Sequence, residues 1–414
     1  MRSIRFMPLA LAAAVLAACG GDGGSGSTAP TTGRLIETPT ATATLARANL
    51  GAGARCDVRV VAINYTTPGA KAGESSNASG GVLVPSGADP ACQGPFPIVA
   101  YARGTSVIKS TAMADPANGE MQGLASTFAS GGYMVVATDY LGYAKSTYPF
   151  HPYLHADSEA TAVIDSIRAA RAYAAANNLP LSGRVMIYGY SQGGHSSLAT
   201  QRAIETNVNV SSEIAIAAAG HGASPAALGT SLRSGGEILG GQFFIPFLIT
   251  AWQKVYGDVY AQPSDIFTPT YAPIIENLLP AANPNALGVL PPGPTYNAQL
   301  FQPSFVPSLQ NGTSGVLRAG QRNDLVASGW NPRSATRFCS GSADPTVLYA
   351  TGQALALRQW GVLSNVTGRD VDPEVQALAA QRGLTAAQTV AQYHGTLAPT
   401  ICLADMRAYF DARR

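Results

Sequence analysis

The chain has 414 residues, of which 46% are hydrophobic and 12% are charged, and its formal net charge is +2. A chain of this length and composition can bury a large core, which excludes a disordered protein. No basic block or stripe occurs, so nucleic acid is not expected as a partner.

The first residues have the features of an export signal. Arg2 and Arg5 precede an apolar stretch, residues 7–18, that is too short to span a bilayer as a stable helix. Residues 16–19 read Leu-Ala-Ala-Cys, which resembles the lipobox of bacterial lipoproteins and implies cleavage before Cys19 and lipid attachment to its thiol. An ordinary secretory signal with an incidental cysteine is the alternative. We therefore expect a signal peptide over 1–18 and a protein that is lipid-anchored to the bacterial cell envelope or secreted.

The segment after the signal has the composition of a tether. Residues 20–33 are mostly Gly, Ser, Thr and Asp, so residues 19–55 are interpreted as a flexible tether and lead-in. No later segment is typical of a transmembrane helix. Four cysteines remain, an even number in an exported chain, which predicts two disulfides whose pairing the spacing leaves open. They are Cys56, Cys92, Cys339 and Cys402. No Cys/His spacing suggests a metal site.

Alternating strands and helices follow the lead-in. Residues 57–65 and 81–85 predict two antiparallel strands that open a mixed sheet. The next elements are predicted as a strand over 97–101, a helix over 120–130, a strand over 133–138 and a helix over 158–178. Asp157 or Ser158 is the expected N-cap of that last helix.

A strand, a sharp turn and a helix then come in immediate succession. Residues 185–188 have the length and branching of a buried parallel strand, and a helix is expected over 195–206. Between them lies Gly-Tyr-Ser-Gln-Gly at 189–193, the G-x-S-x-G pattern of a nucleophile elbow. This is the one complete match in the chain, and it indicates Ser191 as a nucleophile. With a further strand over 213–219, the order predicts a mostly parallel sheet covered by helices on both faces.

The alternation breaks down over residues 223–335. Thirteen of the 28 prolines fall there, and an unstructured loop of this length is implausible inside a compact domain. We interpret the segment as a cap inserted into a core made of residues 56–222 and 336–414. A helix over 245–257 is expected to pack mainly against the core. Phe243, Phe244 and Trp252 are expected to line an acyl or aryl pocket.

The core resumes with a predicted strand over 335–341, followed by a helix over 345–360. Residues 362–388 are ambiguous, with a possible strand over 365–371 and a possible helix over 373–382. His394 is expected in a loop before a terminal helix that ends near residue 412.

A serine nucleophile needs a base and a group that orients the base, and in α/β-hydrolases the chain order is Ser, acid, His. Of the five histidines, His394 alone lies beyond a well-placed acid. Asp344 is the favoured acid because it follows a buried strand, although an aspartate before a proline could also be only a helix cap. Asp324, Asp370 and Asp372 are weaker alternatives. His195 is expected to pack beneath the elbow rather than act as the base.

The oxyanion of a tetrahedral intermediate needs backbone N–H donors. The amide of Gln192, directly after the nucleophile, is one expected donor. Thr105 in the turn after the 97–101 strand is the favoured second donor, with Gly104 as the alternative. Tyr190, Gly104 and Tyr140 are expected at the substrate.

Taken together, these motifs resemble the secretory lipase group of α/β-hydrolases, which is similar to lipase A-type enzymes. The residues that carry the resemblance are 101–105, 139–143, 189–194, 341–344 and 394–396. The resemblance covers residues 56–412 and implies carboxylic-ester hydrolysis without metal or organic cofactor, beneath a cap inserted after the sixth strand. Arg103 departs from the histidine that relatives often place before the glycine, which leaves the charge of the local pocket in question.

In the fold that this resemblance implies, Cys56 and Cys92 flank the opening strands, and Cys339 and Cys402 lie on neighbouring elements. We therefore expect the pairs Cys56–Cys92 and Cys339–Cys402. The predicted protein is a monomeric serine esterase or lipase for apolar acyl or aromatic esters, with the membrane contacted only through the lipid anchor. The alternatives are a serine peptidase or acyltransferase on the same fold, and a hydrolase-fold binding lipoprotein without catalysis.

Overall fold

The computed structural model describes residues 32–293 and 295–414. The predicted signal peptide, the lipobox with Cys19, and most of the predicted tether lie outside the described residues. Within the described ranges, no helix is both long enough and apolar enough to cross a membrane.

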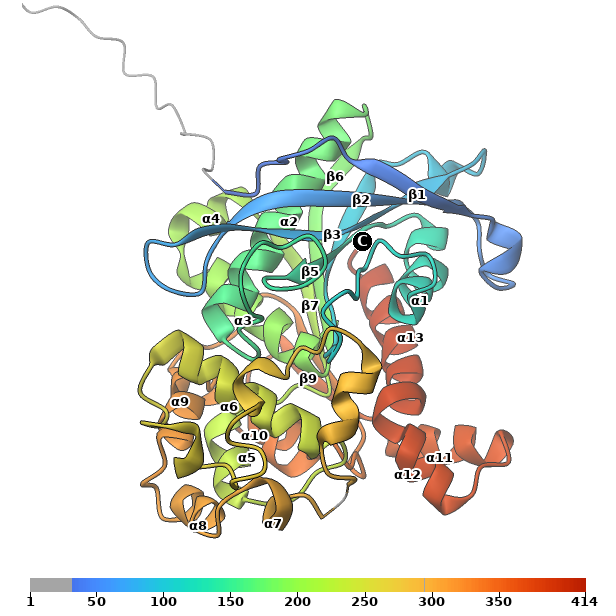
Figure 1. Ribbon diagram of the computed structural model, residues 1–414. Coiled ribbons are helices and arrows are strands. Elements are labelled where there is room, and N and C mark those ends of the chain that lie inside the picture. Colours follow the sequence, from blue (N-terminus) through green and yellow to red (C-terminus); the bar gives the residue numbers. More distant parts are fainter. Residues whose placement is uncertain (1–31, 294) are drawn as a thin grey trace, which may run out of the picture. The chain divides into compact units, whose positions relative to one another are not determined.

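A nine-stranded sheet in the order β1-β2-β3-β5-β4-β6-β7-β8-β9 forms the centre of the fold (Figure 1). Strands β1 to β3 and β5 pair antiparallel, and the pairs from β5 through β4 to β9 are parallel. This mostly parallel sheet confirms the predicted fold class. The strands are β1 (Thr40–Leu45), β2 (Asp57–Pro68), β3 (Ser75–Ser86), β4 (Phe96–Ala102), β5 (Met134–Tyr140), β6 (Leu181–Tyr190), β7 (Ile216–Gly222), β8 (Thr336–Ser340) and β9 (Val366–Asp370).

Helices cover both faces of the sheet because its central strands are apolar on both sides. α1 (Gly119–Thr127) and α13 (Ala398–Asp411) share one hydrophobic cluster with the sheet. α2 (Ala156–Ala176) and α3 (Gln192–Thr206) pack on the opposite face, and α10 (Gln353–Trp360) joins α2 and α3 there in a smaller cluster. Every residue of β4 and β5 is buried. Strand β6, which leads into α3 through the elbow, lies between β4 and β7 in this sheet.

The chain between β7 and β8 forms the helical segment drawn in yellow and orange in Figure 1. Its helices are α5 (Leu228–Ser234), α6 (Gly241–Tyr256), α7 (Asn297–Leu300), α8 (Phe305–Gln310) and α9 (Gly315–Arg322). The rings of Phe247 on α6 and Tyr153 in the core stack with centroids 4.6 Å apart. One hydrophobic cluster continues from the sheet into this segment, so the segment is packed onto the core. The remaining α-helices are α4 (Val208–Glu213), α11 (Asp372–Gln381) and α12 (Ala386–Gln392).

Residues 40–45 of the lead-in form the edge strand β1, which the sequence analysis does not predict. Two expectations about individual elements are wrong. Helix α2 begins at Ala156, so Asp157 and Ser158 lie inside it rather than at its N-cap. The amide of Ala156 instead donates to Oδ1 of Asn323, 2.9 Å away, and a cap from so distant a residue leaves no local signal. The helix expected from residue 345 begins only at Gln353.

Two disulfides join the cysteine pairs that the sequence analysis expects. One links Cys56 to Cys92, and the other links Cys339 to Cys402. Cys339 lies on β8, and Cys402 lies on α13. The second disulfide therefore connects the strand before Asp344 to the helix after His394.

Candidate active site

Ser191 occupies the sharp turn between β6 and α3. Its φ of 61° and ψ of −123° are a strained conformation for a residue with a side chain, as a nucleophile elbow requires. A Cβ on Gly189 would lie 2.0 Å from the carbonyl oxygen of Gly193, and a Cβ on Gly193 would lie 2.0 Å from that of Ala102. Both glycines are therefore required for the close approach of strand, helix and neighbouring strand.

Three side chains from different segments meet at this turn. Nε2 of His394 lies 2.8 Å from Oγ of Ser191, and Nδ1 of the same ring lies 2.7 Å from Oδ2 of Asp344. The side chain of Asp344 is fully buried, while that of His394 is 12% exposed. The imidazole can thus take a proton from the hydroxyl while the carboxylate fixes its orientation.

His394 lies in a π-helical turn, Tyr393–Leu397, between α12 and α13, rather than in the expected loop. None of the alternative acids hydrogen-bonds to it. Asp324 accepts from the amides of Gly229 and Ala327. Asp370 accepts from backbone amides, and Asp372 accepts from the hydroxyl of Tyr393.

The expected oxyanion donors differ in whether their amides are available. Gln192 is the first residue of α3, so its N–H has no acceptor within the helix. The amide of Gly104 donates to Oε1 of Glu120 at 2.7 Å, so it is not available to a substrate. Thr105, whose side-chain hydroxyl lies 2.9 Å from that of Tyr153, has no acceptor for its amide within the described residues. Gln192 and Thr105 are therefore the available pair.

A buried carboxylate beneath the elbow was missed from the sequence. Oε1 of Glu159 accepts from Nε2 of Gln192 at 2.6 Å, and Oε2 accepts from Oγ of Ser196 at 2.6 Å. Oε2 also lies 3.2 Å from Nδ1 of His195. Burial raises the pKa of Glu159, but the hydrogen bond and charge of His195 and the neighbouring donors outweigh burial and leave that pKa below its usual value. A glutamate four positions into an amphipathic helix gives no sign of this role.

His195 lies beneath the elbow, at the place expected for it. Nδ1 faces Glu159, and Nε2 lies 3.0 Å from the carbonyl oxygen of Asn323. Both ring nitrogens thus face oxygen atoms of buried groups. This ring hydrogen-bonds to neither the hydroxyl nor the imidazole of the Ser191–His394 pair.

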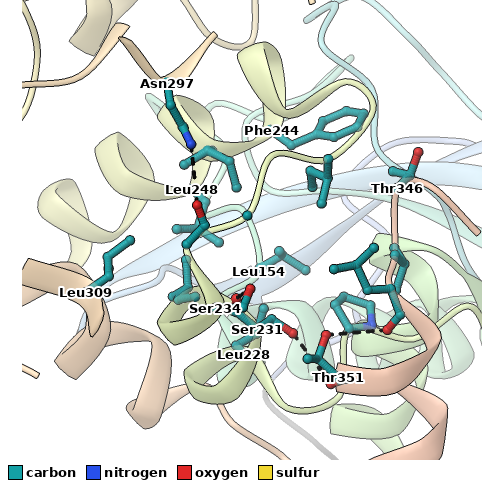
Figure 2. Close-up of a pocket in the computed structure, with 18 of the residues that line it drawn as sticks. Leu154, Leu228, Ser231, Ser234, Phe244, Leu248, Asn297, Leu309, Thr346 and Thr351 are labelled. Carbon is teal, nitrogen blue, oxygen red and sulfur yellow. Dashed lines mark hydrogen bonds between the residues drawn. The ribbon is translucent and has the colours of Figure 1, made fainter. Parts of the chain in front are cut away.

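Two pockets open at Ser191, and Ser191 and Phe244 are the residues that they share. The first, here called the leucine-lined pocket, has a volume of about 120 Å³ and is lined by residues of the core and of the segment between β7 and β8 (Figure 2). Its leucines are Leu154, Leu228, Leu232, Leu248, Leu309 and Leu348. The second, here called the tyrosine-lined pocket, has a volume of about 580 Å³. It is lined by Tyr101, Tyr188, Tyr190, Glu120 and His394, among others.

The expected substrate residues divide between these pockets and the core. Gly104 and Tyr190 line the tyrosine-lined pocket, and Phe244 lies at the junction. The other three line neither pocket, contrary to expectation. Trp252 is fully buried and donates to the carbonyl oxygen of Leu154, Tyr140 is buried and donates to that of Arg103, and Phe243 packs against the core. Helical periodicity identifies the apolar side of a helix, but it does not tell which part of that side meets a cavity.

Arg103 is directed away from both pockets. It is 2% exposed, its Nη1 donates to the carbonyl oxygen of Thr111, and its guanidinium lies 4.9 Å from the ring centroid of Tyr143. Asp139, nearby, accepts from the hydroxyl of Ser79 and the amide of Met113. Burial raises the pKa of Asp139. The arginine therefore supports the wall and adds no charge to the pockets.

A model of the secretory lipase family matches residues 117–262. Over a longer range, the chain is similar to the rice cell wall degrading esterase LipA from Xanthomonas oryzae. The two are 31% identical, the match covers 93% of this chain and 100% of that chain, and the TM-score is 0.83. The chain belongs to the secretory lipase family.

Two more distant structures share the fold. A protein from Legionella pneumophila is 20% identical over 91% of this chain and 97% of its own, with a TM-score of 0.76. Lipase A from Candida antarctica, in its closed state, is 15% identical over 91% of this chain and 90% of its own, with a TM-score of 0.58. A search of curated proteins gave no match. Membership of the secretory lipase family confirms the prediction of an ester-hydrolysing enzyme with an α/β-hydrolase fold.

Proposed function

We propose that this secretory lipase-family protein hydrolyses esters of apolar acyl groups through a Ser191–His394–Asp344 triad. The observation that carries the proposal is the chain of contacts from Oγ of Ser191 through both nitrogens of His394 to the buried carboxylate. The strained backbone of Ser191 supports it, as do the amides of Gln192 and Thr105, which have no acceptor within the described residues.

The reaction follows from this geometry. Oγ of Ser191 attacks the ester carbonyl carbon while its proton passes to Nε2 of His394, and the amides of Gln192 and Thr105 stabilise the oxyanion. The bond between the carbonyl carbon and the alcohol oxygen then breaks, and the imidazolium returns the proton to that oxygen. Water then attacks the carbonyl carbon of the acyl-enzyme in the same way, with His394 as the base, and the carboxylic acid is released. Asp344 keeps the ring oriented throughout.

The leucine-lined pocket is the proposed acyl site. It begins at the nucleophile, and six leucines from the core and from the segment between β7 and β8 are among its lining residues (Figure 2). An acyl chain that enters it exchanges water for apolar surface, which stabilises binding by about 0.8 kcal/mol for each buried methylene.

We also propose that residues 223–335 form the cap domain, that the chain is exported with a lipid attached at Cys19, and that the protein is a monomer.

Two measurements test the proposal. A fluorophosphonate probe should label the wild type at Ser191 and should not label Ser191→Ala, which would separate an enzyme from a binding lipoprotein. Hydrolysis of p-nitrophenyl esters of increasing acyl length should be lost in Ser191→Ala by several orders of magnitude, with the melting temperature unchanged. If Ser191→Ala retained a tenth of the wild-type activity, the assignment of Ser191 as the nucleophile would be wrong. Faster cleavage of peptides than of esters would favour the peptidase alternative.

A further inference from the structure

The two pockets at Ser191 differ in whether they contain the general acid. His394 lines the tyrosine-lined pocket, whereas it is not among the residues that line the leucine-lined pocket. In the proposed mechanism the imidazolium must hand its proton to the departing alcohol oxygen, so the alcohol has to lie on the side of His394. The acyl chain then occupies the leucine-lined pocket, and Phe244 lies between the two portions of the ester.

The tyrosine-lined pocket has one acidic side chain among its apolar and hydroxyl-bearing lining residues. Glu120 is its one carboxylate, and no lysine or arginine is among its lining residues. Oε1 of Glu120 already accepts from the hydroxyl of Tyr101 at 2.6 Å and from the amide of Gly104 at 2.7 Å. Oε2 accepts from no group in residues 32–293 or 295–414, and no cation there pairs with this side chain.

We propose that the tyrosine-lined pocket binds the alcohol portion of the ester and that Glu120 selects alcohols that carry further hydroxyl groups, as in 2,3-dihydroxypropyl esters. A hydroxyl that donates to Oε2 forms a charge-assisted hydrogen bond, which is about twice as strong as a neutral one. Thr105, Thr396 and Thr400 are also among the residues that line the pocket. This inference rests on the proposed function, because it assigns the second half of the same substrate.

A cationic alcohol is the competing ligand for an unpaired carboxylate. Cation recognition by aromatic residues needs open ring faces, and here Tyr101, Tyr188 and Tyr190 are 4%, 1% and 6% exposed. The tyrosines therefore form a packed wall rather than an open cage, which favours hydroxyl donors as the partners of Glu120.

The test compares two esters that differ only in the alcohol, propyl butanoate and 2,3-dihydroxypropyl butanoate. The wild type should have the higher kcat/KM for the dihydroxy ester. Glu120→Gln keeps an Oε1 that can accept from Gly104 and Tyr101 but removes the free carboxylate oxygen, so the ratio of the two kcat/KM values should fall by about tenfold while propyl butanoate is still hydrolysed. Glu37→Gln, a change at an exposed carboxylate paired with Lys145, should leave the ratio unchanged.

The outcomes separate this inference from the proposed function. If the wild type hydrolyses neither ester, the proposed function is wrong. If Glu120→Gln lowers both values equally, Glu120 only positions the Gly104 loop, and the inference is overturned. A wild-type preference for the choline ester of butanoate over the dihydroxy ester, lost in Glu120→Gln, would also overturn it. A second measurement needs no variant: glycerol should capture the wild-type butanoyl-enzyme more efficiently than 1-propanol, and equal capture would contradict the inference.

Discussion

The carboxylate of Asp344 accepts hydrogen bonds from two places, the ring of His394 and the turn that follows Asp344 in the chain. Oδ2 lies 2.7 Å from Nδ1 of His394, while Oδ1 accepts from the amides of Thr346 and Val347 at 2.8 and 3.1 Å. The sequence allowed Asp344 to be either a cap or a catalytic acid. No helix begins at this position, so Asp344 is not a helix cap, but one oxygen holds the turn over 345–347 and the other is directed at the imidazole.

Replacing this carboxylate should therefore separate its two roles. Asp344→Asn keeps an oxygen that can accept from the amides of the turn, but it places an amide donor or a neutral oxygen against Nδ1, which no longer stabilises an imidazolium. We expect kcat to fall by about 10³- to 10⁴-fold with little change in melting temperature. Asp370→Asn is the matched control, since Asp370 also accepts from backbone amides but does not contact His394. Similar kcat values for the two variants would contradict the assignment of Asp344.

The sequence predicts the elbow from a five-residue pattern, and it predicts the acid and the base from their order along the chain after Ser191. The G-x-S-x-G turn requires glycines at fixed positions, and Asp344 follows the short strand predicted over 335–341. The support for the site could not be predicted in the same way. Glu159 and Gln192 lie on different helices, and Glu120 meets Gly104 across a loop. Such pairs arise when distant segments cross, and no spacing in one sequence encodes them.

The network beneath the elbow should affect both stability and rate. Glu159→Gln leaves His195 without its buried anion, and breaking such a pair costs about 3–5 kcal/mol of unfolding free energy. It also releases the side chain of Gln192, so we expect kcat to fall at least tenfold through a less well placed oxyanion donor.

The control for that change is Glu205→Gln. Glu205 is another buried carboxylate, which accepts from the amides of Arg333 and Ser334 away from the elbow. This variant should lose stability in urea denaturation with kcat unchanged. An unchanged kcat in folded Glu159→Gln would show that the network serves stability alone.

Two buried histidines should make the fold sensitive to acid. Burial lowers the pKa of His151 to about 4 and that of His221 to about 3, from an ordinary value of 6.5. The unfolded chain therefore binds protons below about pH 6.5 that the folded chain does not, and stability falls with falling pH until the folded pKa is reached. Each histidine contributes a slope of about 1.4 kcal/mol per pH unit within its window.

Urea denaturation between pH 7 and pH 4 measures this slope. Nε2 of His221 lies 2.9 Å from Oε1 of Gln201, and Nδ1 lies 2.8 Å from the hydroxyl of Ser197, so the neutral ring is hydrogen-bonded on both sides. His221→Gln should be less stable at pH 7 but should lose stability less steeply near pH 5. Parallel curves for the two proteins would show that His221 does not contribute to the acid sensitivity.

The two disulfides should differ in their effect on activity. Both close loops of similar length, with sequence separations of 36 and 63, so each should add about 4 kcal/mol to the free energy of unfolding in the chain-entropy model.

Only Cys339–Cys402 lies between the elements that carry Asp344 and His394. Its removal lets α13 shift against β8, so the distance between the acid and the base becomes less well defined. We therefore expect the double variant with alanine at both Cys339 and Cys402 to have a lower kcat, even when kcat is measured at temperatures well below the melting temperature. The same change at Cys56 and Cys92 should lower stability alone. Equal kcat values in the two double variants, measured where both are folded by circular dichroism, would rule out a role of this bridge in holding the catalytic pair.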